Sequence, residues 1–145
     1  MSRSERKAPP PPDPEMGLWQ GRSVARRFVS PDGMTVLVGR TAGDNDVLSL
    51  KLASPRDFWF HVAGESGSHV VVRNPGGMDR LPRETEQLAA ALAAGYSKAR
   101  KGGRVAVHAC RCADVRKPRG LPPGKVEIER YKNLQVAPWR PDGEG

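Results

Sequence analysis

One long segment of the sequence has the pattern of an amphipathic helix, and short segments with the composition of β-strands lie on both sides of it. The helix is predicted from residue 82 to about residue 101, because a proline stands near its first turn and apolar side chains recur on one helical face. Gly102 and Gly103 follow and are predicted to end the helix. This order of elements favours an α+β fold, with one long helix packed on a mostly antiparallel sheet of hairpins. The apolar side chains of the helix are Leu88, Leu92, Tyr96 and Ala99.

Turn residues divide the strand segments into hairpins. Ser-Pro-Asp-Gly at residues 30–33 places proline and glycine where a tight turn needs them, so the flanking segments are predicted to pair. The glycine- and serine-rich residues 64–68 connect a second predicted hairpin in the same way. We predict strands at residues 26–29, 34–39, 57–62, 69–73 and 104–112 and within 126–136.

The sequence does not decide the local structure of one segment or the orientation of two aromatic side chains in another. Residues 47–52 suit either a short helix capped by Asp44 or Asn45, or a strand, because both structures fit the spacing of their apolar side chains. Trp59 and Phe60 are neighbours in a predicted strand and point to opposite faces, so we expect only one of them to face the core.

The length of 145 residues fits a single domain. Residues 1–20 are rich in proline and charge and are predicted to be a flexible tail, residues 21–138 the folded domain, and residues 139–145 a disordered C-terminal tail. The sequence has neither a membrane-spanning apolar run nor the apolar stretch of a signal peptide. We therefore expect a cytoplasmic protein that does not enter a membrane.

The positive charge is concentrated in the middle of the chain. The net charge is +8 and the pI about 10.1. Residues 21–60 carry six basic and four acidic side chains, and residues 61–120 carry eleven and five. This concentration favours an anionic partner, although a basic surface that only maintains solubility is the alternative.

The cysteines predict neither a disulfide nor a metal site. Cys110 and Cys112 are separated by one residue, which disfavours a strain-free disulfide and is consistent with a reducing compartment. His108 lies on the same predicted strand, about 13 Å from Cys112 at roughly 3.3 Å per residue, so the three side chains are too far apart to share one ion. We expect no metal and no other cofactor.

Five segments, in order between residues 26 and 136, together resemble the NFACT-R domain of ribosome-associated quality-control factors. They include the Asp-Phe-Trp-Phe-His-Val string at residues 57–62, the Gly-Ser-His string that opens residues 67–73, and Tyr-Ser-Lys-Ala-Arg at residues 96–100. Residues 45–46 belong to the same segment as the first string, and the remaining two segments are residues 30–40 and residues 115–118 with 123–126.

The resemblance implies an RNA-contacting domain without catalytic activity. NFACT proteins bind stalled large ribosomal subunits and help recruit tRNA, so the implied partner is structured RNA, either tRNA or rRNA. The chain has no room for the other regions of those proteins, and we expect a stand-alone monomer, with a protein partner possible in addition.

Cations and the glycine-serine-histidine hairpin are the predicted RNA contacts. Side chains at the end of the long helix and on the loop after residue 115 are expected to hold phosphates, and the hairpin is expected to add polar contacts. The predicted RNA-binding residues are Arg40, His61, Ser68, His69, Arg73, Ser97, Lys98, Arg100, Lys101, Arg116, Lys117 and Arg119.

Two other classes of function remain open from the sequence. His61 and His69 would face each other across the second hairpin and could act as an acid and base in an RNA-processing enzyme, but no other residues complete such a site. Alternatively, the proline-rich tail or a sheet edge would dock on a partner in a protein-interaction module.

Overall fold

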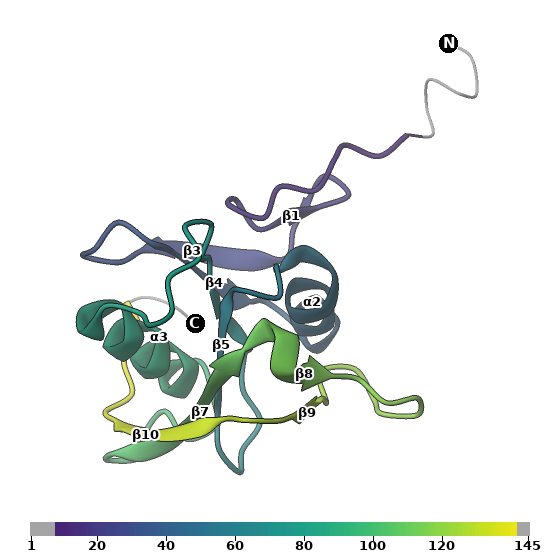
Figure 1. The fold of residues 1–145 in the computed structure, drawn as a ribbon. Helices are drawn as coiled ribbons and strands as arrows, with labels where there is room; N and C mark the ends of the chain where they lie inside the picture. The colour runs from purple at the N-terminus through teal and green to yellow at the C-terminus, as the bar shows by residue number, and fades with distance from the viewer. Residues whose placement is uncertain (1–7, 142–145) are drawn as a thin grey trace.

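The computed structural model describes residues 8–141, which form a six-stranded sheet with a helix, α3 (Arg83–Gly95), across one face (Figure 1). The strands are β3 (Ala25–Val29), β4 (Thr35–Gly39), β5 (Phe58–Val62), β6 (Val70–Val72), β7 (Val105–Arg111) and β10 (Lys132–Val136). Their order is β10-β7-β5-β6-β4-β3, and every neighbouring pair is antiparallel. The predicted α+β class and both predicted hairpins are confirmed.

Shorter elements contribute to the other side of the sheet. They include a second helix beside the one long helix that the sequence predicted, and two two-stranded ribbons. These elements are β1 (Leu18–Trp19), β2 (Arg22–Ser23), α2 (Ala42–Val47), the π-helical turn η1 (Leu48–Leu52), the 3₁₀ turn η2 (Cys112–Asp114), β8 (Val115–Arg116) and β9 (Glu127–Ile128).

Both faces of the sheet are buried, so the expectation that only one of two neighbouring aromatic residues faces the core was wrong. Phe60 packs with α3 in one apolar cluster, and Trp59 packs with η1 in another. Their exposed fractions are 1% and 2%. Because Trp59 is enclosed, its ring is not available to stack on a base.

The segment at residues 47–52 is helical, as one of the two alternatives predicted. Its cap is neither of the expected residues: the hydroxyl of Thr41 accepts a hydrogen bond from the amide of Asp44 at 3.1 Å. The Asn45 side chain is buried and accepts a hydrogen bond from the amide of His69 at 3.0 Å. Glycine at position 39 permits this contact, because a Cβ there would lie 1.9 Å from the Asn45 oxygen.

Helix α3 ends at Gly95, earlier than the two glycines predicted to stop it. The following residues pair with the loop before β6 instead of continuing the helix. The amide of Ser68 donates to the carbonyl of Tyr96 at 3.0 Å, and the amide of Lys98 donates to the carbonyl of Ser66 at 2.9 Å. This short ladder brings the glycine-serine-histidine segment beside the end of the helix.

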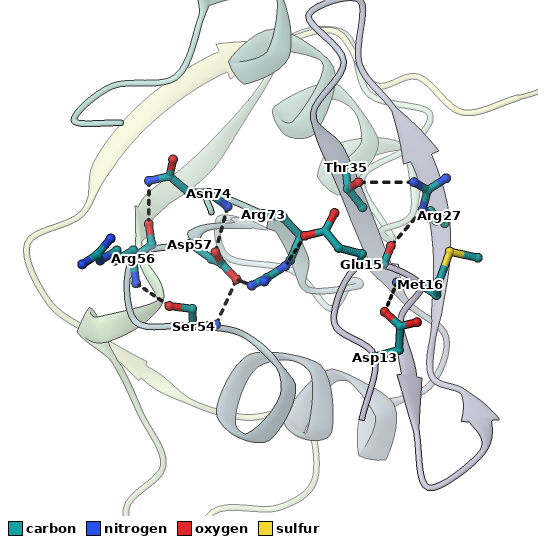
Figure 2. A network of polar contacts seen from close by, with 10 residues as sticks. All are labelled: Asp13, Glu15, Met16, Arg27, Thr35, Ser54, Arg56, Asp57, Arg73 and Asn74. Atoms are coloured by element: carbon teal, nitrogen blue, oxygen red, sulfur yellow. Dashed lines mark hydrogen bonds and ion pairs between the residues drawn. The ribbon is translucent and has the colours of Figure 1, made fainter. Parts of the chain in front are cut away.

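The described part of the predicted N-terminal tail differs from that prediction, because residues 13–19 pack on the sheet. Glu15 forms an ion pair with Arg73 at 2.9 Å, and Arg73 pairs in turn with the buried Asp57; Figure 2 shows the three side chains together. The Nε group of Arg27 donates to the carbonyl of Glu15 at 2.8 Å. Sequence patterns miss this because the segment has no apolar run: it is held by an ion pair, backbone contacts and the packing of Trp19 against a buried apolar cluster. Residues 1–7 lie outside the described residues.

At the other end of the chain, residues 137–141, which we call the C-terminal segment, cross α3. The amide of Trp139 donates to the carbonyl of Ala91 at 3.0 Å. The backbone of Trp139 also lies against Gly95, where a Cβ would be only 2.1 Å from the Trp139 oxygen. Residues 142–145 of the predicted disordered tail lie outside the described residues.

Candidate nucleic-acid interface

A shallow hollow of about 400 Å³ lies beside the end of α3, and five cationic side chains line it. We call it the basic pocket. Its other walls come from the start of α2 and from the loop before β6. Among the described residues that line the pocket there is no carboxylate, so its cations are suited to an anionic ligand. The cations are Arg26, Arg40, Lys98, Arg100 and Arg140.

Small residues fix the turn that presents Lys98 and Arg100. Gly67 lies so close to Ser97 that a Cβ at Gly67 would be 2.7 Å from the Ser97 Cβ. The Ser97 hydroxyl donates to the carbonyl of Ala94 at 2.6 Å and accepts from the amide of Ala99 at 3.0 Å. Ser97 therefore closes the helix end, while the two cations remain exposed.

An aromatic ring organises two further cations. The guanidinium of Arg26 lies 5.0 Å from the ring centroid of Tyr96, and that of Arg140 lies 5.5 Å from it, both within the range of cation–π attraction. Phe28 packs against the same ring at a centroid distance of 6.4 Å. These contacts occupy the Tyr96 ring and hold guanidinium groups at the pocket wall.

Five of the sequence-predicted residues meet at this pocket. Four of these line it with exposed or half-buried side chains, whereas Ser97 is buried and shapes the turn. At the opposite wall, the Nε group of Arg40 donates to the hydroxyl of Ser23 at 3.1 Å, which orients that guanidinium. The five are Arg40, Ser68, Ser97, Lys98 and Arg100.

His69 does not line the basic pocket, because its side chain is buried and hydrogen-bonded within the fold. It is 1% exposed, and both ring nitrogens are engaged: Nδ1 lies 2.8 Å from the Ser49 hydroxyl and Nε2 lies 3.0 Å from the carbonyl of Gly124. The indole of Trp59 donates to the same hydroxyl at 2.9 Å, so Ser49 donates to Nδ1 and the Nε2 proton of His69 bonds to Gly124. This chain of bonds ties the base of the β8–β9 loop to the sheet.

Burial lowers the pKa of His69 from 6.5 to about 4, and the charge of His61 acts in the same direction. The unfolded chain binds this proton more tightly, so the free energy of unfolding should fall by roughly 3 kcal/mol as the pH drops from about 6.5 to about 4. We expect His69→Gln to reduce this pH dependence in urea unfolding measured across that range. A pH profile identical to that of the unmodified chain would contradict the assignment.

Three of the predicted cations are neutralised by carboxylates. Arg73 pairs with Asp57 and Glu15, and Arg116 lies 3.0 Å from Glu127 and 3.4 Å from Glu129. Counting charge segment by segment does not reveal these ion pairs, because the partners are distant along the chain or alternate on the next strand.

Lys117 is the third paired cation. Its Nζ lies 3.0 Å from a carboxylate oxygen of Asp46 and donates to the carbonyls of Pro122 and Lys125. These contacts use the ammonium to close the β8–β9 loop, which projects from the sheet in Figure 1. Lys117 therefore stabilises the loop rather than presenting its charge.

The remaining predicted residues lie outside the basic pocket. Lys101 and Arg119 are exposed, and neither lines it. His61 is half-buried between two rings, with centroids 5.8 Å from Trp59 and 5.5 Å from His69, and burial lowers its pKa. The basic surface is thus smaller than the sequence suggested and is centred on the helix end.

Sequence reasoning missed Arg26, Tyr96 and Arg140 as pocket residues. Arg26 precedes the first hairpin turn and Tyr96 was assigned to the helix core, while Arg140 fell in the expected tail. The signal available for Tyr96 was an aromatic residue at the end of an otherwise alanine-rich helical pattern, whereas Arg26 is followed by a second arginine and nothing in the sequence distinguishes the two. No sequence signal predicted that residue 140 returns to the helix.

The cysteines behave as small apolar side chains. Burial raises the pKa of Cys110 to about 12 and that of Cys112 well above its usual value, so both remain protonated thiols. Within residues 8–141 no three histidine, cysteine or acidic side chains are grouped to hold a metal. In the same part of the chain no helix is long and apolar enough to cross a membrane.

Residues 25–130 match the model of a family of RNA-binding domains. That family is described as the NFACT protein RNA binding domain. The chain therefore belongs to the NFACT-R family. It is 33% identical over 115 residues to the Rqc2 homolog RqcH of Bacillus subtilis, covering 79% of this chain and 20% of that protein. A shorter match, 31% identical over 72 residues, covers 50% of this chain and 7% of a ribosome quality control complex subunit, the NEMF homolog of Drosophila melanogaster.

A solved structure supports the same fold. The C-terminal part of the fibronectin/fibrinogen-binding protein from Streptococcus suis aligns with a TM-score of 0.75 and 35% identity, over 81% of this chain and 47% of that one. The chain spans about a fifth of the length of the RqcH relatives it matches. The C-terminal segment that carries Arg140 lies beyond the residues matched by the family model.

Proposed function

We propose that this chain binds the sugar-phosphate backbone of structured RNA, either tRNA or rRNA, through the basic pocket. The observation that carries this proposal is the convergence of five cations from separate parts of the chain on one hollow whose described lining contains no carboxylate. Membership of an RNA-binding family supports the choice of RNA over other polyanions.

The pocket favours recognition of backbone shape over base sequence. Proteins that read unpaired bases usually stack them on open aromatic rings, whereas contacts to paired RNA are mainly to phosphates and 2′-hydroxyls. Two guanidinium groups and Phe28 already surround the Tyr96 ring, and the buried Trp59 offers no surface. A folded RNA with closely spaced phosphates is therefore the ligand that this pocket suits best.

We further propose a role in translation or ribosome-associated quality control, for a monomer that works in the cytoplasm without a catalytic step. The relative whose name includes a ribosome quality control complex supports this setting. The engagement of both His69 ring nitrogens supports binding without acid–base chemistry by the histidine pair. Sedimentation with large ribosomal subunits, with and without tRNA, would test the ribosomal part separately.

The direct test is to titrate end-labelled tRNA with the protein at several salt concentrations and to recover the RNA afterwards. We expect retarded but intact RNA and an affinity that falls steeply with salt, because cations that contact phosphates displace counterions. Cleaved or modified RNA would favour the enzyme alternative. Absence of binding at low salt would reject the proposal.

The C-terminal segment is expected to matter for affinity because it carries Arg140 to the pocket. In Gly95→Ala the new methyl group would overlap the Trp139 carbonyl and displace the segment. We expect Gly95→Ala and Arg140→Ala each to weaken tRNA binding by about tenfold, the value of one charged hydrogen bond. Affinity measured by fluorescence anisotropy checks this.

Gly103→Ala is the matched control, since no atom lies within 4 Å of a Cβ at that position. It should bind tRNA like the unmodified chain. If Arg140→Ala weakens binding while Gly95→Ala does not, contact with Gly95 is not what places the segment.

A further inference from the structure

A second hollow, of about 570 Å³, lies at the opposite end of α3 from the basic pocket. Phe58, Phe60, Leu81 and Ala109 contribute apolar lining. Charged side chains come from the segment before α3 and its first turn, from the end of β7 and η2, and from the residues at the start of β10. It shares no residue with the basic pocket. The two ends of a 13-residue helix are about 20 Å apart, so the hollows are separate places on one molecule.

Charge in this hollow is only partly compensated. Two of its carboxylates are already ion-paired, Glu86 with Lys132 at 2.7 Å and Asp114 with Arg130. Within residues 8–141, Arg80 and Arg83 make no ion pair or side-chain hydrogen bond, although both line the hollow. Two guanidinium groups are therefore available for an anionic group of a ligand.

A third carboxylate in the hollow, that of Asp79, also makes no side-chain hydrogen bond or ion pair with the described residues. Its backbone is fixed, because the guanidinium of Arg111 donates to the carbonyls of Asp79 and Met78, at 2.8 and 3.2 Å. Arg111 is in turn held over the Phe58 ring at 4.2 Å. The contact with Arg111 thus places the Asp79 carboxylate, a hydrogen-bond acceptor, in the lining of the hollow next to the unpaired Arg80.

Tyr131 provides an aromatic surface at the same hollow. It is 46% exposed, and its one ring contact among the described residues is with His108, at 4.4 Å between centroids. The preceding residue, Arg130, adopts a left-handed backbone with φ of 47° and pairs with Asp114. Such backbone is uncommon outside glycine, so the ion pair holds the turn that presents Tyr131.

We propose that this hollow binds one nucleotide, with its phosphate on Arg80 and Arg83, its base against Tyr131, and a ribose hydroxyl or base amino group on Asp79. An anion-binding pair, a hydrogen-bond acceptor and an open ring over an apolar floor together match the parts of a nucleotide. An acidic peptide would use the arginines but neither the acceptor nor the ring. The nucleotide comes either from an unpaired position in an RNA bound at the basic pocket, which rests on the proposed function, or from a free mononucleotide.

The test compares two RNA hairpins that differ by one extruded nucleotide, together with a nucleoside 5′-monophosphate. If the nucleotide belongs to RNA, the bulged hairpin should bind at least about fivefold more tightly, the low end of what one base stacked on an aromatic ring contributes. Tyr131→Leu and the Arg80→Ala/Arg83→Ala pair should each remove this preference and leave the paired hairpin unaffected. If the nucleotide is free, the monophosphate should shift the amide NMR signals of residues 79–81, 83 and 131, and the hairpins should bind equally.

The two proposals fail separately. The Lys98→Ala/Arg100→Ala variant should weaken both hairpins equally and retain the preference for the bulge. Should neither hairpin bind, RNA binding is rejected and the monophosphate titration alone decides the second site. Equal hairpin affinities combined with no response to the monophosphate would overturn the nucleotide proposal, as would amide signals at residues 79–81 and 83 that respond only to a poly-glutamate peptide.

Discussion

Replacing Lys98 and Arg100 together by alanine should weaken tRNA binding by about 100- to 200-fold at physiological salt. Each side chain is expected to contribute about 1.5 kcal/mol through a charge-assisted contact with phosphate. The slope of log affinity against log salt should also become shallower by roughly 1.5, because two fewer phosphates are neutralised. Anisotropy titrations at four or five salt concentrations give both quantities.

The fold should survive this change. The exposed ammonium and guanidinium groups are removed, whereas the bonds that form the turn come from the backbone amides of both residues. Arg116→Ala/Arg119→Ala is the matched control: it removes the same formal charge from the β8–β9 ribbon and loop, and neither residue lines the basic pocket. If the control variant loses as much affinity as the test variant, net charge rather than the pocket determines binding.

Asp57→Ala should destabilise the fold by about 3 to 5 kcal/mol, the expected cost of leaving a buried charge without its partner. Asp57 is fully buried, and its carboxylate accepts hydrogen bonds from the amides of Ser54 and Asn74, each at 2.9 Å, and from Arg73 (Figure 2). Removing it would leave Arg73 with only the half-exposed Glu15. Urea unfolding monitored by tryptophan fluorescence measures the loss.

Glu65→Ala is the control for this prediction, since Glu65 is exposed and makes no hydrogen bond or ion pair with the described residues. Its effect should stay within about 0.5 kcal/mol. A loss below about 1 kcal/mol in Asp57→Ala would show that the network in Figure 2 contributes little to stability and that residues 13–17 are held by other contacts.

The sequence allowed the sheet to be predicted because its signals are local. Proline and glycine at residues 30–33 define the first hairpin, and the β-branched composition of residues 70–72 defines a buried strand. The long helix follows from its period, but its end does not: Gly95 terminates it where a distant backbone and a neighbouring loop dock.

The candidate site was harder to predict than the fold, because it depends on pairing between distant residues. Lys98 and Arg40 face a common hollow, whereas Arg73 and Lys117 have the same formal charge but carboxylate partners elsewhere in the chain. His69 belongs to a motif that suggested RNA contact, yet its ring completes a buried hydrogen-bond chain. Residue type indicated the chemistry, and only tertiary structure separated available charges from compensated ones.

The most direct test of RNA binding at the end of α3 is to map amide NMR shifts of the ¹⁵N-labelled chain during titration with tRNA at moderate salt. We expect the largest changes at residues 26, 40, 66–68, 96–100 and 140, which surround the basic pocket. Shifts confined to residues 115–129, on the β8–β9 ribbon and its loop, with the basic pocket unchanged, would contradict the account.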